Sequence, residues 1–208
     1  MPQNSATDAF TRQSPHFEEE EEANPIISYI RYRVRQQLLK LTDPGQQVLE
    51  LNAGTGMDAA FLARQERIVT ATELADGMFR ELLAKAQQPT TEGRLSATQL
   101  DFHQLDQLRG GPFDLVFSNF GGLNCTPDLA SVFEPLDHLL KPGRMAVLVI
   151  MPPVCPWELS YLLRGKGKLA LRRLSGKAPA HLEGTYFDTW YFTPAKVRKA
   201  FPDSFQQI

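Results

Sequence analysis

The fold of this chain is decided by residues 48–60, which read VLELNAGTGMDAA. A short apolar run ends in an acidic residue, a loop with two glycines follows, and a helical pattern begins at once. Such a loop lets a ligand approach the main chain at the carboxyl end of a strand, where α/β sheets bind ligands. The helix that follows offers free N–H groups to the same ligand. A single loop of this kind is a weak signal, so the interpretation depends on its partners along the chain.

Strand and helix patterns alternate on both sides of this loop. Strands are predicted at 47–51, 67–72, 95–99, 113–118 and 145–151, and helices at 25–41, 58–65, 76–87 and 129–140. Strands separated by helices of this length form a parallel sheet with helices on both faces. The predicted fold class is therefore α/β, with a doubly wound, mostly parallel, Rossmann-like sheet. Residues 186–192 alternate like a further strand, which is expected to be antiparallel.

Length and composition describe one ordinary globular domain. The chain has 208 residues, 42% of them hydrophobic and 22% charged, with a formal net charge of −2. This balance gives no reason to expect a general attraction to nucleic acid or membranes. Cys125 and Cys155 do not make a disulfide framework, so reduced thiols in the cytoplasm are the simpler interpretation. Neither a signal peptide nor a membrane span is predicted.

Two segments stand apart from the alternating pattern. Residues 1–24 form an N-terminal arm that contains the acidic run 18–22, interpreted either as a solvated helix start or as a flexible lid. Residues 25–208 form the domain, within which prolines interrupt the rhythm and open an insert at about 152–184. The insert combines Trp157 and Tyr161 with several basic residues.

The glycines and a downstream carboxylate indicate a ligand that contains adenosine. Gly54 and Gly56 fit the spacing G-x-G-x-x-A, with Ala59 in the third position, as in dinucleotide-binding folds. Glu73 lies 19 residues after Gly54, at the end of the second predicted strand. A carboxylate at that place accepts hydrogen bonds from the hydroxyls of a ribose.

Glu50 distinguishes between two ligands of this type. A nicotinamide dinucleotide places its pyrophosphate beside the loop, where a carboxylate would repel it. A ligand with an ammonium or a sulfonium would instead gain roughly 1 to 4 kcal/mol from an opposite charge at about 4 Å. The sign of Glu50 therefore favours S-adenosylmethionine over NAD. The alternative is that Glu50 is an ordinary surface carboxylate at a strand end.

Further candidate residues follow the third and fourth predicted strands. Asp101 can accept a hydrogen bond from an adenine amino group with Phe102 packed nearby, or it can be a helix N-cap beside a core phenylalanine. Met78 can cover the adenine or belong to a helix core. Residues 119–124 lie where the reactive end of a ligand would be, and there Asn124 can bind a substrate or cap a turn.

These motifs together resemble the class I S-adenosylmethionine-dependent methyltransferase family, in the small-molecule type. The resemblance covers about residues 25–201 and includes the turn at 140–143. It implies S-adenosyl-L-methionine as the cofactor and no metal. It also implies a last antiparallel strand that the chain barely begins at 204–208, so that the chain is a fragment or the sheet edge is completed by other means. The cofactor-binding residues that it implies are Glu50, Asn52, Ala53, Gly54, Thr55, Gly56, Asp58, Glu73, Leu74, Met78, Asp101, Phe102, Asn119, Phe120 and Gly121.

The expected reaction is methyl transfer to a small-molecule or lipid-like acceptor, without an identified general base. In similar enzymes an N-terminal arm closes over the site, and the insert after the fifth strand builds the acceptor pocket. The substrate-side candidates are therefore Phe10, His16, Phe17, Asn124, Trp157 and Tyr161. Nucleic acid is not favoured, because residues 119–122 read NFGG and lack the motif of base-methylating enzymes. Two other functions remain open, a non-catalytic module that binds an adenosine ligand and an NAD-linked oxidoreductase.

Overall fold

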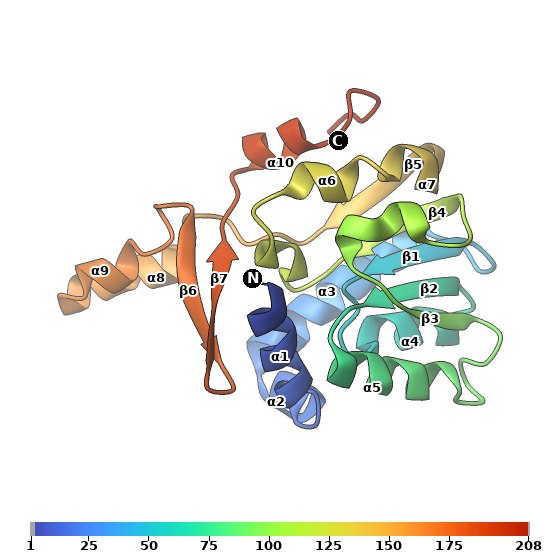
Figure 1. The fold of residues 1–208 in the computed structure, drawn as a ribbon, viewed down its shortest axis with the longest axis horizontal. Coiled ribbons are helices and arrows are strands. Elements are labelled where there is room, and N and C mark those ends of the chain that lie inside the picture. The colour runs from blue at the N-terminus through green and yellow to red at the C-terminus, as the bar shows by residue number, and fades with distance from the viewer. Residues whose placement is uncertain (1–2, 208) are drawn as a thin grey trace.

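The computed structural model describes residues 3–207, and its centre is a five-stranded parallel sheet with the strand order β3-β2-β1-β4-β5 (Figure 1). The central strands β1 and β4 are buried along nearly their whole length, as expected for a parallel sheet covered on both faces. The predicted α/β doubly wound fold is confirmed. The strands are β1 Gln47–Leu51, β2 Ile68–Glu73, β3 Leu95–Gln99, β4 Phe113–Ser118 and β5 Leu140–Leu148.

Helices cover both faces of the sheet and enclose two hydrophobic cores. One core lies under α3 Pro25–Leu41, α4 Met57–Arg64 and α5 Asp76–Ala86, where Leu38, Leu62 and Leu82 pack on the sheet. The other lies under α6 Leu129–Phe133, α7 Leu136–Leu139 and the 3₁₀ helix η1 Phe102–Gln107. The helix predicted at 129–140 is divided in two at Pro135, whose ring removes a backbone donor.

The helix predicted from Pro25 is present, with Asn24 as its N-cap, but the first half of its apolar stripe is not buried. Ile26 is 69% exposed and Ile30 40% exposed, whereas Leu38 is fully buried. Of the early positions it is Arg31 that turns inward. None of the helices in the described part of the chain is long and apolar enough to cross a membrane.

The N-terminal arm is helical and packs on the domain. It comprises α1 Gln3–Gln13 and α2 Phe17–Ala23. The alanines Ala6 and Ala9 of α1 are buried in a small cluster with Phe187 of β7 Thr185–Trp190. The arm thus joins the main domain to the C-terminal hairpin, as the ribbon shows (Figure 1).

The C-terminal antiparallel strand is present, but it lies in a separate hairpin. β6 Lys177–Leu182 pairs with β7, and neither strand joins the main sheet. β5 is therefore an edge strand beside an open groove of about 1090 Å³, over which α10 Pro194–Ala200 and residues 204–207 pass. Residues 204–207 form no strand, so the predicted start of a last strand is absent there, and Ile208 lies outside the described residues.

Between β5 and β6 the chain forms a small helical lobe that projects from the domain (Figure 1). We use this name for residues 152–176. The lobe contains α8 Pro156–Leu159, the 3₁₀ helix η3 Ser160–Arg164 and α9 Gly167–Ala170. The lobe makes up most of the insert predicted at about 152–184, and its first two helices cover the short amphipathic helix expected at 157–163.

Candidate functional site

The glycine loop between β1 and α4 has three residues in the left-handed region of backbone conformation. Asn52, Gly54 and Gly56 all have positive φ angles, of 46°, 59° and 82°. A Cβ at Gly56 would lie 2.5 Å from Leu82 Cδ1, so the loop also packs closely on α5. Glycine is therefore required here for conformation and for close approach. The N-terminus of α4 follows directly, with its first amides facing the same edge of the sheet.

Glu73 is fixed against this loop by backbone amides. Its Oε2 accepts from Gly54 N at 2.8 Å, and its Oε1 accepts from Leu74 N at 2.9 Å and Ala75 N at 2.8 Å. Burial raises the pKa of Glu73, and the three amides act in the opposite direction. A carboxylate has about four acceptor positions, so a further hydrogen bond from a ligand can be accommodated.

Glu50 is buried at the end of β1 with one oxygen unpartnered. Its side chain is 2% exposed, and Oε2 has no hydrogen-bond partner. Thr55 Oγ1, in the glycine loop, is also buried without a partner. Burial raises the pKa of Glu50 well above its ordinary value, Asp58 raises it further, and Arg31, Arg35 and the amide of Ala59 lower it. An unpartnered buried carboxylate oxygen is costly, and a cationic ligand would relieve that cost.

Asp58 is the centre of a buried charge cluster behind the loop. Arg31 and Arg35, one helical turn apart on α3, donate to its two oxygens at 2.6 Å each. Asn119 Nδ2 donates to Asp58 Oδ2 at 2.8 Å, and Glu21 of α2 binds the other side of Arg31 at 2.5 Å. Asp58 was predicted to bind the cofactor; the structure shows three protein donors on its oxygens, and its contact with a cofactor stays a prediction. Neither arginine was predicted from the sequence as part of the site, although their i, i+4 spacing within an apolar stripe was a usable signal.

The loop after β4 lies beside the glycine loop. Asn52 Oδ1 accepts from Ser118 Oγ at 3.1 Å, and a Cβ at Gly122 would overlap Asn52 Nδ2. The ring of Phe120 lies 4.4 Å from the Arg31 guanidinium carbon, and Phe120 has a positive φ of 50°. The structure therefore brings the predicted residues 119–121 next to the end of β1.

The predicted adenine-side residues follow β3. Asp101 caps η1, with its Oδ1 accepting from His103 N, and it also contacts His103 Nδ1 at 2.9 Å. The capping interpretation of Asp101 is thus confirmed, and its binding of adenine stays a prediction. Phe102 packs against the core under α6, while Met78 is buried at 2% exposure in α5, which agrees with its interpretation as helix core.

The N-terminal arm lies over the loop and the start of α5. Phe17 Cε1 would lie 3.9 Å from a Cβ on Gly54, and Gly77 N donates to Thr11 Oγ1 at 3.2 Å. Lys85 pairs with Glu18 at 2.5 Å. The other two predicted residues of the arm do not point to the loop: Phe10 packs on Phe187 with ring centroids 5.7 Å apart, and His16 is exposed at the start of α2.

The part of the chain that carries this geometry is similar to a known sequence family. Residues 48–143 match the sequence family described as a methyltransferase domain. The matched segment includes the glycine loop, Glu73 and β4, so the site described above lies within the part of the chain that is similar to a methyltransferase domain. A demethylmenaquinone methyltransferase from Beutenbergia cavernae is 34% identical over 120 residues, which are 57% of this chain and 47% of that protein. The chain thus covers about half the length of this curated relative.

Solved structures agree on the fold. A methyltransferase from Methanosarcina mazei has a TM-score of 0.63 and 20% identity, over 80% of this chain and 82% of the other. A structure titled as a complex of DhpI with S-adenosylhomocysteine also has a TM-score of 0.63, with 16% identity, over 94% and 83% of the two chains. At these identities the likeness concerns the fold alone.

The residues of this site fit S-adenosylmethionine, the cofactor that the sequence predicts. The cofactor carries an ammonium, a ribose and a sulfonium. Glu50 offers a buried oxygen without a partner, and Glu73 is already fixed at the loop by amides. The negative charge of Glu50 suits a cation and is unsuited to a pyrophosphate.

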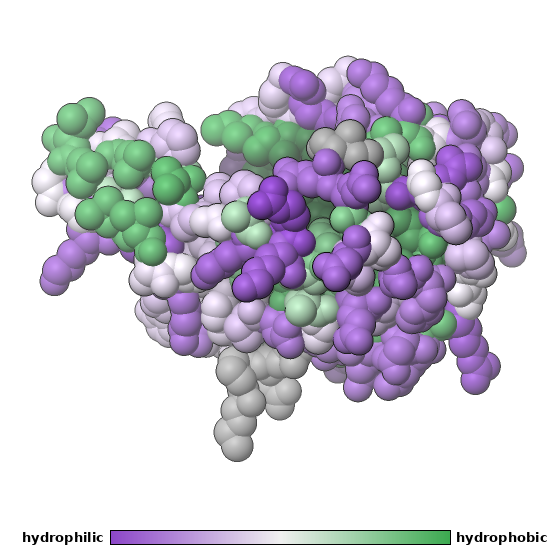
Figure 2. Space-filling view, turned by 90° about the horizontal axis from the view of Figure 1, so that it is seen from above, coloured by the Kyte–Doolittle hydropathy of each residue, from purple (hydrophilic) through white to green (hydrophobic). Residues whose placement is uncertain are grey.

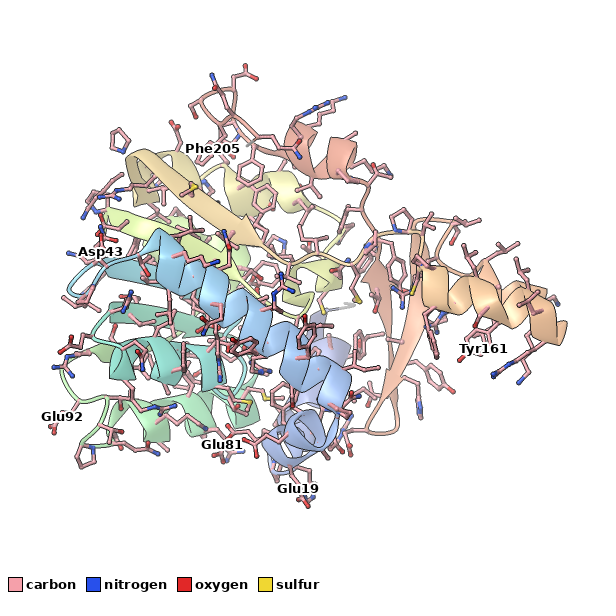
Figure 3. The ribbon with its side chains drawn as sticks, turned by 180° about the vertical axis from the view of Figure 1, so that it is seen from behind. Glu19, Asp43, Glu81, Glu92, Tyr161 and Phe205 are labelled. Atoms are coloured by element: carbon pink, nitrogen blue, oxygen red, sulfur yellow. The ribbon has the colours of Figure 1, made fainter. Side chains whose placement is uncertain are left out.

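Three predicted substrate-side residues are not part of this arrangement. Asn124 is fully buried, and its amide binds Met151 N, Met151 O and Trp190 O, so it fixes the hairpin to the domain. Trp157 and Tyr161 lie on the projecting lobe, and Tyr161 is seen well away from the sheet (Figure 3). The sequence placed them near the site because they follow β5, but the lobe carries them outward.

We expect replacement of Gly77 by alanine to loosen the N-terminal arm. A Cβ there would overlap the carbonyl oxygen of Thr11 and lie 2.5 Å from Ser14 Oγ, so α1 must move. Hydrogen exchange should accelerate in α1 and α2 while the main sheet stays protected. Gly167→Ala is the matched control, because its Cβ would meet only Leu162 Cδ2, at 3.9 Å. Unchanged exchange in α1 would show that the arm does not depend on this contact.

Proposed function

We propose that this chain transfers the methyl group of S-adenosylmethionine to a small-molecule or lipid-like acceptor. The single observation that carries the proposal is the unpartnered, buried oxygen of Glu50 beside a glycine loop that Glu73 holds in place. The two carboxylates lie at the carboxyl ends of the adjacent strands β1 and β2. They suit the two ends of one ligand, an ammonium at Glu50 and ribose hydroxyls at Glu73.

The bound cofactor supplies a methyl group on a sulfonium, which is already a good leaving group. The chain therefore has to bind, orient and exclude water, and these contributions come from positioning. In the proposal, Glu50 and Glu73 fix the amino-acid and ribose parts, and Asp101 with Phe102 lies at the adenine side. The arm shields the loop through Phe17 and acts as a lid. No general base is assigned.

The acceptor class is inferred from the curated relative and from the sequence of the loop after β4. The relative's name states that it methylates demethylmenaquinone, which favours a lipid-like acceptor for this chain. The loop after β4 reads NFGG, which agrees with a small-molecule acceptor and does not favour nucleic acid. We place the reaction in the cytoplasm, since Cys125 and Cys155 are free thiols.

A second candidate function is a module that binds the adenosine ligand without catalysis. The side chain of Asn124 is occupied by backbone groups, and Trp157 and Tyr161 lie on the projecting lobe, which favours this function because fewer acceptor-side groups then remain. The NAD-linked alternative lacks such support, because Glu50 would repel the pyrophosphate. Turnover separates the first two functions: methyl transfer from labelled cofactor to demethylmenaquinol or to a metabolite extract would be absent for a binding module.

The cofactor assignment is tested by calorimetric titration of the full chain with S-adenosylhomocysteine and with NAD. We expect binding of the sulfur compound only. Glu73→Ala should weaken it by ~1 to 3 kcal/mol, because the ribose acceptor and the acceptor of three amides are lost together. Glu81→Ala, on the exposed face of α5 (Figure 3), is the control and should leave affinity unchanged. A folded wild-type chain that does not bind S-adenosylhomocysteine would disprove the proposal.

A further inference from the structure

The projecting lobe, residues 152–176, exposes an unusual amount of apolar surface. Half of the exposed large hydrophobic side chains in the described chain lie within these 25 residues. Leu163 is 92% exposed and Trp157 77% exposed. Seen from above, apolar side chains gather on the projecting lobe at the left of the molecule (Figure 2). The exposed apolar residues of the lobe are Val154, Trp157, Leu162, Leu163, Leu169, Leu171 and Leu174.

The lobe also carries positive charge that the rest of the chain does not share. It has five basic residues and one acidic residue, so its formal net charge is +4, while the whole chain carries −2. The single acid, Glu158, is buried and binds both Arg172 and Arg173, each through two hydrogen bonds. Glu158 therefore holds the lobe together internally. The exposed cations Arg164, Lys166 and Lys168 form none of the ion pairs found in the described structure.

We propose that this lobe docks the methyltransferase domain onto the surface of an anionic lipid bilayer. Exposed leucines and a tryptophan beside lysines and arginines are the composition that binds the interface of a membrane. Apolar side chains enter the boundary of the acyl chains, and the cations bind lipid phosphates. The lobe reaches the surface first because it projects from the domain (Figure 1).

Charge decides between a bilayer and a second copy of the chain. Two lobes meeting patch to patch would bring like charges of +4 together, which opposes association. An anionic bilayer offers the opposite charge and an apolar phase together. Docking of this kind does not require the lobe to span the membrane, because the short helices of the lobe would lie at the interface between water and lipid.

Docking through the lobe would also orient the site. The lobe begins directly after β5, whose carboxyl end lies at the same edge of the parallel sheet as the glycine loop after β1. A docked lobe therefore turns that edge toward the bilayer. If the proposed function holds, a lipid-like acceptor would reach the site from the membrane. The docking itself is independent of cofactor binding and of turnover.

The test is sedimentation of the full chain with vesicles, without cofactor. We expect binding to vesicles of phosphatidylcholine mixed with phosphatidylglycerol, and much weaker binding to phosphatidylcholine alone. Leu163→Glu should reduce partitioning onto these vesicles about tenfold, and the double variant Lys166→Gln/Lys168→Gln roughly 20-fold. Added salt should weaken vesicle binding of the wild type, as loss of the two lysines does. Ile68→Glu is the control, since Ile68 is 45% exposed at the start of β2, outside the lobe, and should bind like wild type.

A spectroscopic reading distinguishes insertion from mere attraction of charge. The chain has two tryptophans, so Trp190→Phe leaves Trp157 as the only one. Its emission should shift to the blue on anionic vesicles. Equal sedimentation of wild type and the lobe variants would overturn the proposal. A second outcome would also overturn it: the wild type binds no vesicles, forms a dimer in solution, and becomes a monomer with Leu163→Glu. The apolar patch would then be an interface between copies of the chain.

Discussion

Replacing Glu50 by glutamine is expected to weaken S-adenosylhomocysteine binding by ~1.5 to 3 kcal/mol, roughly 10- to 100-fold, and to make the folded chain more stable at neutral pH. The first effect follows because the ligand ammonium loses its opposite charge. The second follows because glutamine of nearly the same shape removes a buried carboxylate with an unpartnered oxygen. Calorimetric titration measures the affinity, and thermal unfolding without ligand measures the stability.

The pH dependence of the wild type follows from the raised pKa of Glu50. Between its ordinary pKa and the raised value, the unfolded chain has lost the proton of Glu50 while the folded chain still holds it. The free energy of unfolding therefore falls as pH rises through this window, and the Glu50→Gln variant lacks that contribution. Binding of S-adenosylhomocysteine changes in the opposite direction, because only the ionised carboxylate attracts the ammonium.

Methylthioadenosine provides the matched control, since it lacks the amino-acid part of the cofactor. Wild type and Glu50→Gln should bind it equally. An equal loss of affinity for both ligands would mean that the substitution disturbs the loop as a whole. An unchanged affinity for S-adenosylhomocysteine would remove Glu50 from the site and with it the observation that favours a cationic ligand.

The sheet and its glycine loop could be predicted because their signals are local. The positive φ angles of Gly54 and Gly56 and the placement of Glu73 at the end of β2 follow from a short motif and its spacing. β4 was predicted with its observed limits, because six buried residues form one apolar run. Where local pattern and tertiary packing agree, sequence reasoning succeeds.

The remaining features depend on contacts between distant segments. Arg31 lies within an apolar stripe. Only the fold brings it into contact with Asp58, which is 27 residues further along the chain. The arm was interpreted as a solvated segment or a flexible lid, and its packing on the hairpin was not predicted because its two buried alanines give little hydrophobic signal. Trp157 and Tyr161 appeared to be acceptor-side residues from their position after β5, but the direction in which the lobe projects is not encoded in that order.

The largest loss of stability is expected from Asp58→Asn. The substitution leaves Arg31 and Arg35 without their shared carboxylate in a cluster where Asp58 is 2% exposed. Removing one partner of a buried ion pair costs ~3 to 5 kcal/mol, which corresponds to a fall in Tm of roughly 10 °C for a chain of this size. Chemical and thermal unfolding measure the change. Asp106→Asn, an exposed carboxylate in η1, should change little, and a loss below about 1 kcal/mol for Asp58→Asn would contradict a structural role of the cluster.

Asp58 is also coupled electrostatically to Glu50, so Asp58→Asn should change the pH dependence of ligand binding as well as stability. Asp58 raises the pKa of Glu50, whereas Arg31 and Arg35 lower it. Without the charge of Asp58 the two arginines act on Glu50 unopposed, so the carboxylate ionises at lower pH. The pH midpoint for S-adenosylhomocysteine binding should therefore shift downward in Asp58→Asn, measured at a temperature where the variant is folded. A midpoint that stays in place while stability falls would show that Asp58 supports the fold without tuning the site.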